Sequence, residues 1–143
     1  MTTSRQQMLI RESFAAAKEL ADPLARLFFG RLFQISPEVR PLFRSDMNAQ
    51  GKKLMDLLEL VVGSVGHLDP LRPRLRELGA RHVGYGVEPH QYEAVSAALI
   101  WAIGQASVLT MESREAWRVL LNEISAEMLS SSPAHDTTRG QPR

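Results

Sequence analysis

Hydrophobic positions recur at helical spacing through nearly the whole chain. Near the N-terminus, Leu9, Phe14, Ala17 and Leu20 form one apolar face, and charged residues occupy the positions around it. The sequence contains no sustained alternation with a period of two and no Asn-Gly or Asp-Gly hairpin turn, which are the usual signals of β-strands. The spacing therefore predicts an all-α fold.

Proline and turn residues divide this helical pattern into about seven helices with short connections. The segment Ser36–Glu38 predicts a helix start in which the Ser36 hydroxyl caps the first turn. A long helix is expected from Ala49, the pairs Asp69-Pro70 and Glu88-Pro89 predict the next two starts, and the last helix is expected from about Thr110. This number of helices excludes a simple four-helix bundle.

The chain has the length of one domain, and its pattern changes near the C-terminus. Its 143 residues are enough to enclose a hydrophobic core. Residues 131–143 are rich in Ser, Thr, Pro and Gly and show no apolar period. We therefore predict a helical domain over residues 1–130, followed by a disordered tail over residues 131–143.

Composition narrows the classes of partner. A net charge of +1 gives no general reason to expect a nucleic acid or a membrane surface as partner. The chain has no cysteine, which excludes disulfides and thiolate metal sites and suits a reducing cytoplasm. The first residues do not resemble a signal peptide, and no uncharged run reaches the ~20 residues that span a bilayer. We therefore expect a cytoplasmic protein.

Two other functions of small helical domains fit poorly. A DNA-binding domain needs a basic recognition helix, but the candidate at residues 72–76 contains Pro73 and is followed by Glu77. A carboxylate-bridged metal site needs Glu-x-x-His pairs on facing helices, and Glu88-Pro-His90 has the wrong spacing. A purely structural helical bundle stays open on this evidence.

Two segments carry a more specific pattern. Residues 28–43 read FFGRLFQISPEVRPLF, and residues 80–92 read ARHVGYGVEPHQY. Both closely resemble the globin family, above all the bacterial single-domain haemoglobins and the globin part of flavohaemoglobins. The resemblance covers about residues 5 to 130. It implies a globin fold of about seven helices that encloses haem b (iron protoporphyrin IX).

The resemblance implies that His82 is the only protein ligand to the iron and that Phe43 stacks on the haem. His82 follows Leu75 and Leu78 on nearly the same apolar helix face. A lone histidine in such a place is by itself more often a core residue than a metal ligand, but the family pattern favours the ligand. A neutral imidazole in an apolar slot is also what haem iron requires. The other residues that the resemblance places around the haem are Phe29, Gln50, Lys53, Leu54, Arg81, Val87, Tyr92 and Val95.

Two of these positions bear on the gas ligand. The helix spacing of the family places Gln50 over the iron and Leu54 one turn later on the same face. A glutamine amide can donate a hydrogen bond to dioxygen. Phe29 stands where the bacterial relatives usually carry a tyrosine, so one further donor is lost. We therefore expect a lower oxygen affinity than in tyrosine-bearing relatives. Lys53 and Arg81 would pair with the haem propionates.

The other side of the predicted pocket also departs from the family pattern. Tyr92 matches a tyrosine that, together with a glutamate, hydrogen-bonds the iron-bound imidazole in flavohaemoglobin-like proteins. The place of that glutamate falls on Ser132, and Glu127 comes too early by more than a turn. A more neutral imidazole favours reversible gas binding over oxidative catalysis.

The leading interpretation is therefore reversible binding of dioxygen for storage or transport, with nitric oxide and carbon monoxide as other ligands. An alternative is a nitric oxide dioxygenase, with weak peroxidase activity also open. It would need a separate reductase as partner, because the sequence has no glycine-rich flavin or nicotinamide fingerprint. A third interpretation is the gas-sensing domain of a longer protein. We expect a monomer or a homodimer.

Overall fold

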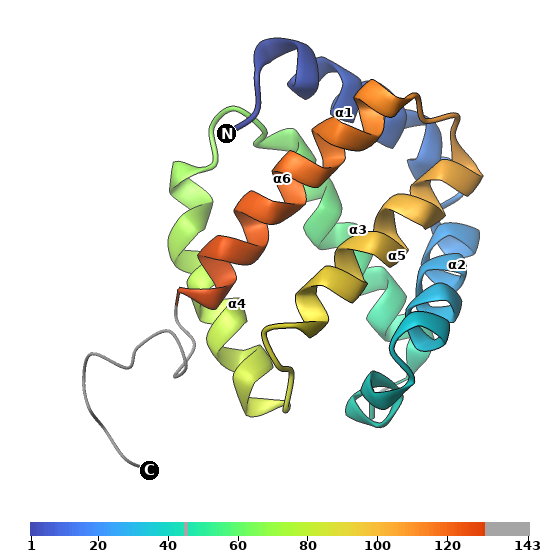
Figure 1. Cartoon of the computed structure of the whole chain (residues 1–143), viewed down its shortest axis with the longest axis vertical. Helices are drawn as coiled ribbons and strands as arrows, with labels where there is room; N and C mark the ends of the chain where they lie inside the picture. The colour runs from blue at the N-terminus through green and yellow to red at the C-terminus, as the bar shows by residue number, and fades with distance from the viewer. Residues whose placement is uncertain (45, 131–143) are drawn as a thin grey trace.

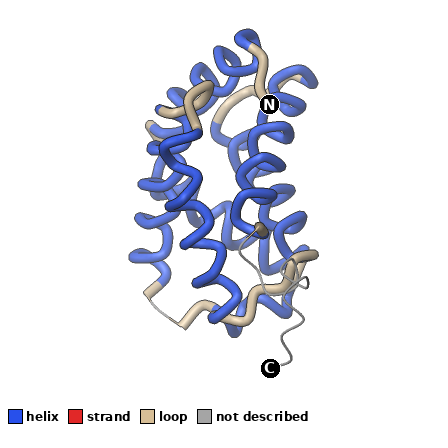
Figure 2. Tube along the Cα trace, turned by 90° about the vertical axis from the view of Figure 1, so that its left-hand side faces the viewer, coloured by secondary structure: helices blue, strands red, loops and turns tan. Residues whose placement is uncertain are grey.

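The computed structural model describes residues 1–44 and 46–130, and all regular structure in these residues is helical (Figure 1, Figure 2). This confirms the all-α prediction. None of these helices is both long and apolar enough to cross a bilayer. In chain order the helices are α1 (Ser4–Lys18), α2 (Ala21–Ile35), the 3-10 helix η1 (Pro37–Leu42), α3 (Met47–Gly63), the 3-10 helix η2 (Asp69–Leu71), α4 (Arg72–Gly84), α5 (Gln91–Ala106) and α6 (Met111–Leu129).

Hydrogen bonds to orphan backbone groups explain where the outer helices begin. At α1, the Thr3 hydroxyl accepts from the backbone N of Gln6 at 3.1 Å, and the Gln6 side chain accepts from the backbone N of Thr3 at 2.9 Å. This reciprocal pair is a capping box. At α6, the Thr110 hydroxyl accepts from the backbone N of Ser113 at 3.0 Å, so the predicted start near Thr110 is confirmed.

One predicted cap and one predicted helix start near the middle of the chain are wrong. A short helix begins at Pro37 as predicted and is of the 3-10 type, but the hydroxyl of Ser36 caps no backbone N–H and donates instead to the carboxylate of Glu38. Helix α3 begins two residues before Ala49, because the Asp46 side chain accepts from the backbone N of Asn48 at 3.3 Å. A side-chain cap at Asp46 thus sets the start of α3.

The two starts that proline suggested are also displaced. The pair Asp69-Pro70 opens the short helix η2, and α4 begins only at Arg72. Pro89 lies in a turn, and α5 begins at Gln91. The buried side chain of Gln91 accepts from the backbone N of Glu88 at 2.9 Å, and this bond closes the turn before the helix.

The core is centred on the middle of α6. Trp117 is completely buried, its ring lies 6.4 Å from that of Phe14 on α1, and its indole N–H donates to the Ser13 hydroxyl at 2.8 Å. A buried indole with a satisfied N–H contributes both apolar area and a fixed orientation. Helix α6 thereby ties α1 to the rest of the molecule.

The helices around this core fall into two groups. Helix α2 packs on α5 and α3, whereas α4 packs mainly on α6. In Figure 1, α4 and α2 lie at opposite sides of the molecule, with α5 between them. Some apolar side chains of α3, α4 and α5 are only half-buried, among them Leu54, Leu78 and Val95. These side chains pack against the core and keep part of their apolar surface accessible.

Candidate functional site

His82 lies in the last turn of α4, and its ring is oriented by its own helix. Its Nδ1 lies 2.8 Å from the carbonyl oxygen of Leu78, one turn earlier. A carbonyl only accepts, so Nδ1 carries the proton and Nε2 keeps its lone pair. Nε2 has no hydrogen-bond partner among residues 1–44 and 46–130. The ring thus presents one unprotonated nitrogen.

The surroundings of His82 favour the neutral imidazole. Burial lowers the pKa of His82 below its ordinary value of 6.5; the positive charge of Arg81 acts in the same direction, and the bond to Leu78 opposes both. Metal ions bind the neutral form of imidazole. The exposed ring of Tyr85 packs near it, with 5.8 Å between the ring centroids. Geometry and charge therefore both suit a metal ligand.

Phe43 belongs to a cluster of aromatic rings at the end of α2. The centroid of its ring lies 5.4 Å from that of Phe29 and 5.6 Å from that of Phe33, both in edge-to-face arrangements. Phe29 is only 7% exposed, whereas Phe43 is half-buried. Edge-to-face pairs at this separation are favourable. The structure therefore brings together the two aromatic residues that the sequence analysis selected separately.

Helix α3 carries three of the predicted residues in its first half. Gln50 and Leu54 are both half-buried and stand four residues apart, hence on the same face of the helix. The side-chain amide of Gln50 makes no hydrogen bond with any other described residue, whereas its backbone N donates to the carbonyl of Asp46 at 3.0 Å. Lys53 is exposed and forms no ion pair within the described part of the chain, whereas its neighbour Lys52 pairs with Asp56 at 3.5 Å.

Arg81 and Val87 flank the end of α4. Arg81 is exposed and pairs with Glu77 at 3.1 Å along the helix surface. Gly86 has a φ of +95°, and the backbone N of Val87 donates to the carbonyl of His82 at 3.0 Å. Glycine adopts this left-handed conformation without strain, so the chain can turn back directly behind His82. Val87 is half-buried there.

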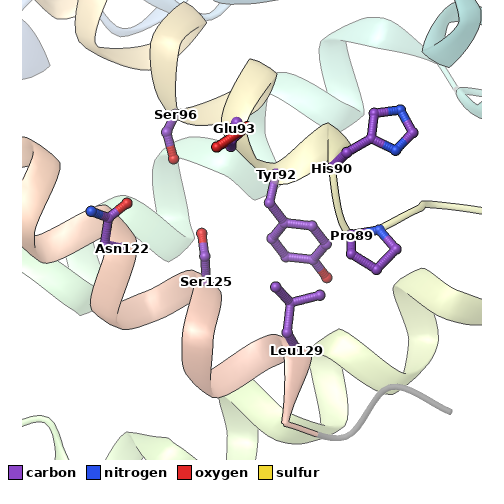
Figure 3. Close-up of a pocket in the computed structure, with 8 residues that line it drawn as sticks. All are labelled: Pro89, His90, Tyr92, Glu93, Ser96, Asn122, Ser125 and Leu129. Atoms are coloured by element: carbon purple, nitrogen blue, oxygen red, sulfur yellow. The ribbon is translucent and has the colours of Figure 1, made fainter. Parts of the chain in front are cut away.

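Tyr92 and Val95 lie in the first turns of α5. Tyr92 lines a cavity of about 390 Å³ between α5 and α6, and Figure 3 shows its ring beside Leu129 and Pro89. Burial raises the pKa of its phenol. The hydroxyl makes no hydrogen bond within the described residues, and Nδ1 of His82 already bonds to Leu78. The pairing of Tyr92 with the imidazole stays a prediction.

The acidic residue considered for this side of the site has another role in the structure. Ser132 and the predicted tail lie outside the described residues. The carboxylate of Glu127 accepts hydrogen bonds from Arg72, at 2.8 Å, and from Arg76, both on α4. The sequence analysis missed this ion cluster and the close approach of Gly79 to α6. The spacing of four residues between Arg72 and Arg76 was the available signal.

The donor set fits a haem better than a bare metal ion. No group of three or more His, Cys, Asp or Glu side chains converges anywhere in the described residues. His82 therefore offers a single nitrogen, and apolar side chains elsewhere in the fold, such as Phe43 and Leu54, are only half-buried. One imidazole cannot complete the coordination shell of a bare metal ion, but a porphyrin supplies four nitrogens of its own and needs an apolar wall.

Comparison with known protein sequences relates the chain to one family. The sequence model of the family described as Globin matches residues 26–128. Neuroglobin of Tetraodon nigroviridis is 26% identical, and the match covers 88% of this chain and 89% of that protein. Bacterial flavohemoproteins also match, and the chain spans only about a third of their length, for example 37% in one of them.

Solved structures share the arrangement of helices. A bacterial globin from Campylobacter jejuni superposes with a TM-score of 0.80 at 22% identity, covering 94% of this chain and 99% of that one. A protein of Rhodothermus marinus with a suggested nitric oxide dioxygenase activity, engineered as a carbene transferase, gives a TM-score of 0.84 at 20% identity. That match covers 99% of this chain and 100% of the other. At these identities the likeness concerns the fold.

Proposed function

The chain belongs to the globin family, and on that premise we propose that it binds haem through His82 and holds dioxygen reversibly. The observation that carries the proposal is the state of the His82 ring. Its Nδ1 proton is engaged by Leu78 at 2.8 Å, its Nε2 is free of protein partners in the described residues, and its pKa is lowered. A fixed, neutral imidazole is a ligand that haem iron binds well.

Haem supplies a ferrous iron that binds diatomic gases such as dioxygen, nitric oxide and carbon monoxide. The chain's own residues would hold the group. His82 would supply a nitrogen ligand to the iron, and the half-buried side chains of Phe43, Leu54 and Val95 would supply apolar contact. Lys53 is an exposed cation without a described partner and is the better candidate for a propionate, because Arg81 already pairs with Glu77.

Two residues would set how firmly the gas is held. Gln50 is half-buried, and its side-chain amide has no described hydrogen-bond partner, so this amide can donate to a partly charged oxygen ligand. Phe29 is buried against Phe43 and offers no donor. A single donor supports release of the gas rather than its long retention, which suits storage or transport.

A haem titration of the purified protein tests the proposal. The wild type is expected to give a Soret band that saturates at one haem per chain. His82→Gly should lose this band or show a shifted one, and added imidazole should restore it, because free imidazole can replace the missing ring. His67→Gly is the matched control, since His67 is an exposed histidine in the connection after α3. An unchanged spectrum in His82→Gly would overturn the proposal.

A second candidate function is nitric oxide dioxygenation. It is favoured by the similarity to the Rhodothermus marinus protein and to flavohemoproteins. Conversion of nitric oxide and dioxygen to nitrate needs one electron from a reductase for each turnover. Sustained nitric oxide consumption with an added flavoprotein reductase would support this function. Slow, stoichiometric consumption would favour the carrier.

A further inference from the structure

The helix that carries His82 is attached to the molecule mainly through one neighbour. Helix α4 packs on α6 and on the short helix η2 that precedes it, and its contact with α3 and α5 is slight. Figure 1 shows α4 lying beside α6 at one side of the molecule. The position of His82 therefore depends on how α4 is fixed to α6.

The first point of attachment is a group of charges at the beginning of α4. The Arg72 guanidinium donates to Glu127 at 2.8 Å and to Glu123 at 3.0 Å, both on α6. Arg76 donates to the second oxygen of Glu127. The two arginines stand four residues apart on α4, and the two glutamates stand four residues apart on α6. The arginines therefore share one face of α4, and the glutamates share one face of α6. The planar fork of arginine makes such bonds directional.

These charges are more sheltered than a surface ion pair. The side chain of Glu127 is 14% exposed and that of Arg72 is 28% exposed. Arg72 also donates to Asp69 at 2.8 Å, which joins η2 to the same group. An exposed ion pair contributes little to stability, whereas removal of one partner from a sheltered group leaves a charge without compensation.

The second point of attachment is a close approach of the two backbones. Gly79 is buried, and a Cβ atom at this position would overlap the carbonyl oxygen of Met128 on α6. Leu75 on α4 and the side chain of Met128 on α6 are both buried. Gly79 stands three residues before His82, directly before the turn that carries the ring. Attachment at two points restricts both sliding and rotation of α4.

We propose that the Arg72–Glu127 ion pair and the Gly79–Met128 contact position the iron ligand. The bond from Nδ1 to Leu78 fixes the ring to the backbone of α4. The two attachments fix α4 to α6, so a shift of α4 moves Nε2 with it. Arg72, Glu127 and Gly79 are positioning residues that act through His82. This inference rests on the proposed function.

The test uses haem-loaded protein with Glu127→Gln. The frequency of the iron–histidine stretching vibration in the ferrous, gas-free form is expected to shift, because the orientation of the ring changes. Transfer of haem to an excess of apomyoglobin should be roughly tenfold faster, the lower end of the range for groups that orient metal ligands. Arg72→Lys keeps the charge but loses the fork and should give a smaller shift.

Two controls separate positioning from general stability. Glu115→Gln removes an exposed pair with Arg118 on the same helix, and it should leave both measurements unchanged. Ser13→Ala removes the partner of the Trp117 indole and should lower stability without moving the vibration. A shift in Ser13→Ala of the same size as in Glu127→Gln, or no shift in Glu127→Gln, would overturn the inference.

Gly79→Ala tests the backbone contact separately and should shift the same vibration, because the added Cβ forces α4 away from α6. Arg72→Lys is the milder variant to use if Glu127→Gln does not fold. Hydrogen exchange in the haem-free proteins gives a measurement that does not depend on the cofactor. The amides of α4 should exchange faster in Glu127→Gln, while those of α2 stay unchanged. Faster exchange in α4 without any haem uptake by the wild type would reject the proposed function alone. Unchanged exchange would reject the positioning role alone.

Discussion

The two sides of the candidate site are held together by different forces. Around Phe43, the wall consists of aromatic rings in mutual contact, with Phe29 buried at its base. Around His82, one imidazole stands at the end of a helix that ion pairs and a close backbone contact attach to α6. Contacts between aromatic rings are spread over a large area and permit small shifts of the side chains. Ion pairs and close backbone contacts permit only one arrangement of the two helices. The aromatic side is therefore suited to apolar contact with a bound group, and the His82 side is suited to holding the ligand nitrogen in one position.

The largest expected effect is loss of the aromatic base. Phe29→Ala removes a buried ring that contacts both Phe33 and Phe43, and it should cost about 3–5 kcal/mol of unfolding free energy. Urea denaturation measures the change. Leu27→Ala is the control, because Leu27 is exposed on the same helix. Equal losses in the two variants would contradict the view that this wall depends on packing.

The next effect concerns the ion pairs of Glu127 with Arg72 and Arg76 and their loss at acid pH. Burial alone would raise the pKa of Glu127, but the bonds from Arg72 and Arg76 outweigh it, so the pKa lies below the ordinary value of 4.5. The folded state therefore binds this proton at lower pH than the unfolded state, and the stabilisation is present above the ordinary value and lost as pH falls through the folded one.

Glu127→Gln should accordingly lose about 1–2 kcal/mol of unfolding free energy at pH 7, since the bonds involve charged groups. Its stability should also fall less steeply than that of the wild type below the ordinary pKa. Urea titrations at a series of pH values measure both. A wild type and a variant with parallel profiles would show that the ion cluster contributes nothing.

A smaller effect tests the gas side of the aromatic wall. Gln50→Leu should speed dioxygen release by roughly five- to tenfold, the equivalent of one hydrogen bond of about 1 kcal/mol. Phe29→Tyr should slow it, because the hydroxyl adds a second donor. Stopped-flow dissociation in the haem-loaded protein measures both rates. Slow release in the wild type that Gln50→Leu leaves unchanged would contradict the single-donor hypothesis.

The smallest effect is expected at the exposed cations Arg81 and Lys53. Arg81→Ala removes an exposed pair with Glu77, and it should change the unfolding free energy by less than about 0.5 kcal/mol. Lys53→Ala should increase the rate of haem loss more than Arg81→Ala does, because Lys53 has no described ion pair to give up. Haem transfer kinetics compare the two variants. The opposite order would assign the propionate to Arg81.

Periodicity along the chain was sufficient to predict the helices, because each apolar stripe is local in sequence. Helix starts were harder to predict. Asp46 and Gln91 begin helices through side-chain bonds to neighbours, while the more conspicuous prolines at positions 70 and 89 lie in a 3-10 helix and in a turn. Proline limits only its own φ and the residue before it, so it marks a break without fixing the first helical residue.

Individual site residues were easier to select from the sequence than the contacts that support them. His82 and Phe43 stand in the two segments with the most specific pattern. Glu127 was considered only as the carboxylate partner of Tyr92 and was set aside because it comes too early by more than a turn. Its burial and its bonds to Arg72 and Arg76 exist only after α4 and α6 pack, and residues 72 and 127 are too far apart in sequence for local patterns to relate them.

The bond between His82 and Leu78 also limits proton movement. A backbone carbonyl can hold a proton in a hydrogen bond but cannot take it up, in contrast to a carboxylate or a water chain. Within residues 1–44 and 46–130, the Nδ1 proton of His82 therefore has no bonded group that could take it up during a change in the oxidation state of a bound metal. We expect electron transfer to this protein to proceed without proton uptake or release at the ligand itself.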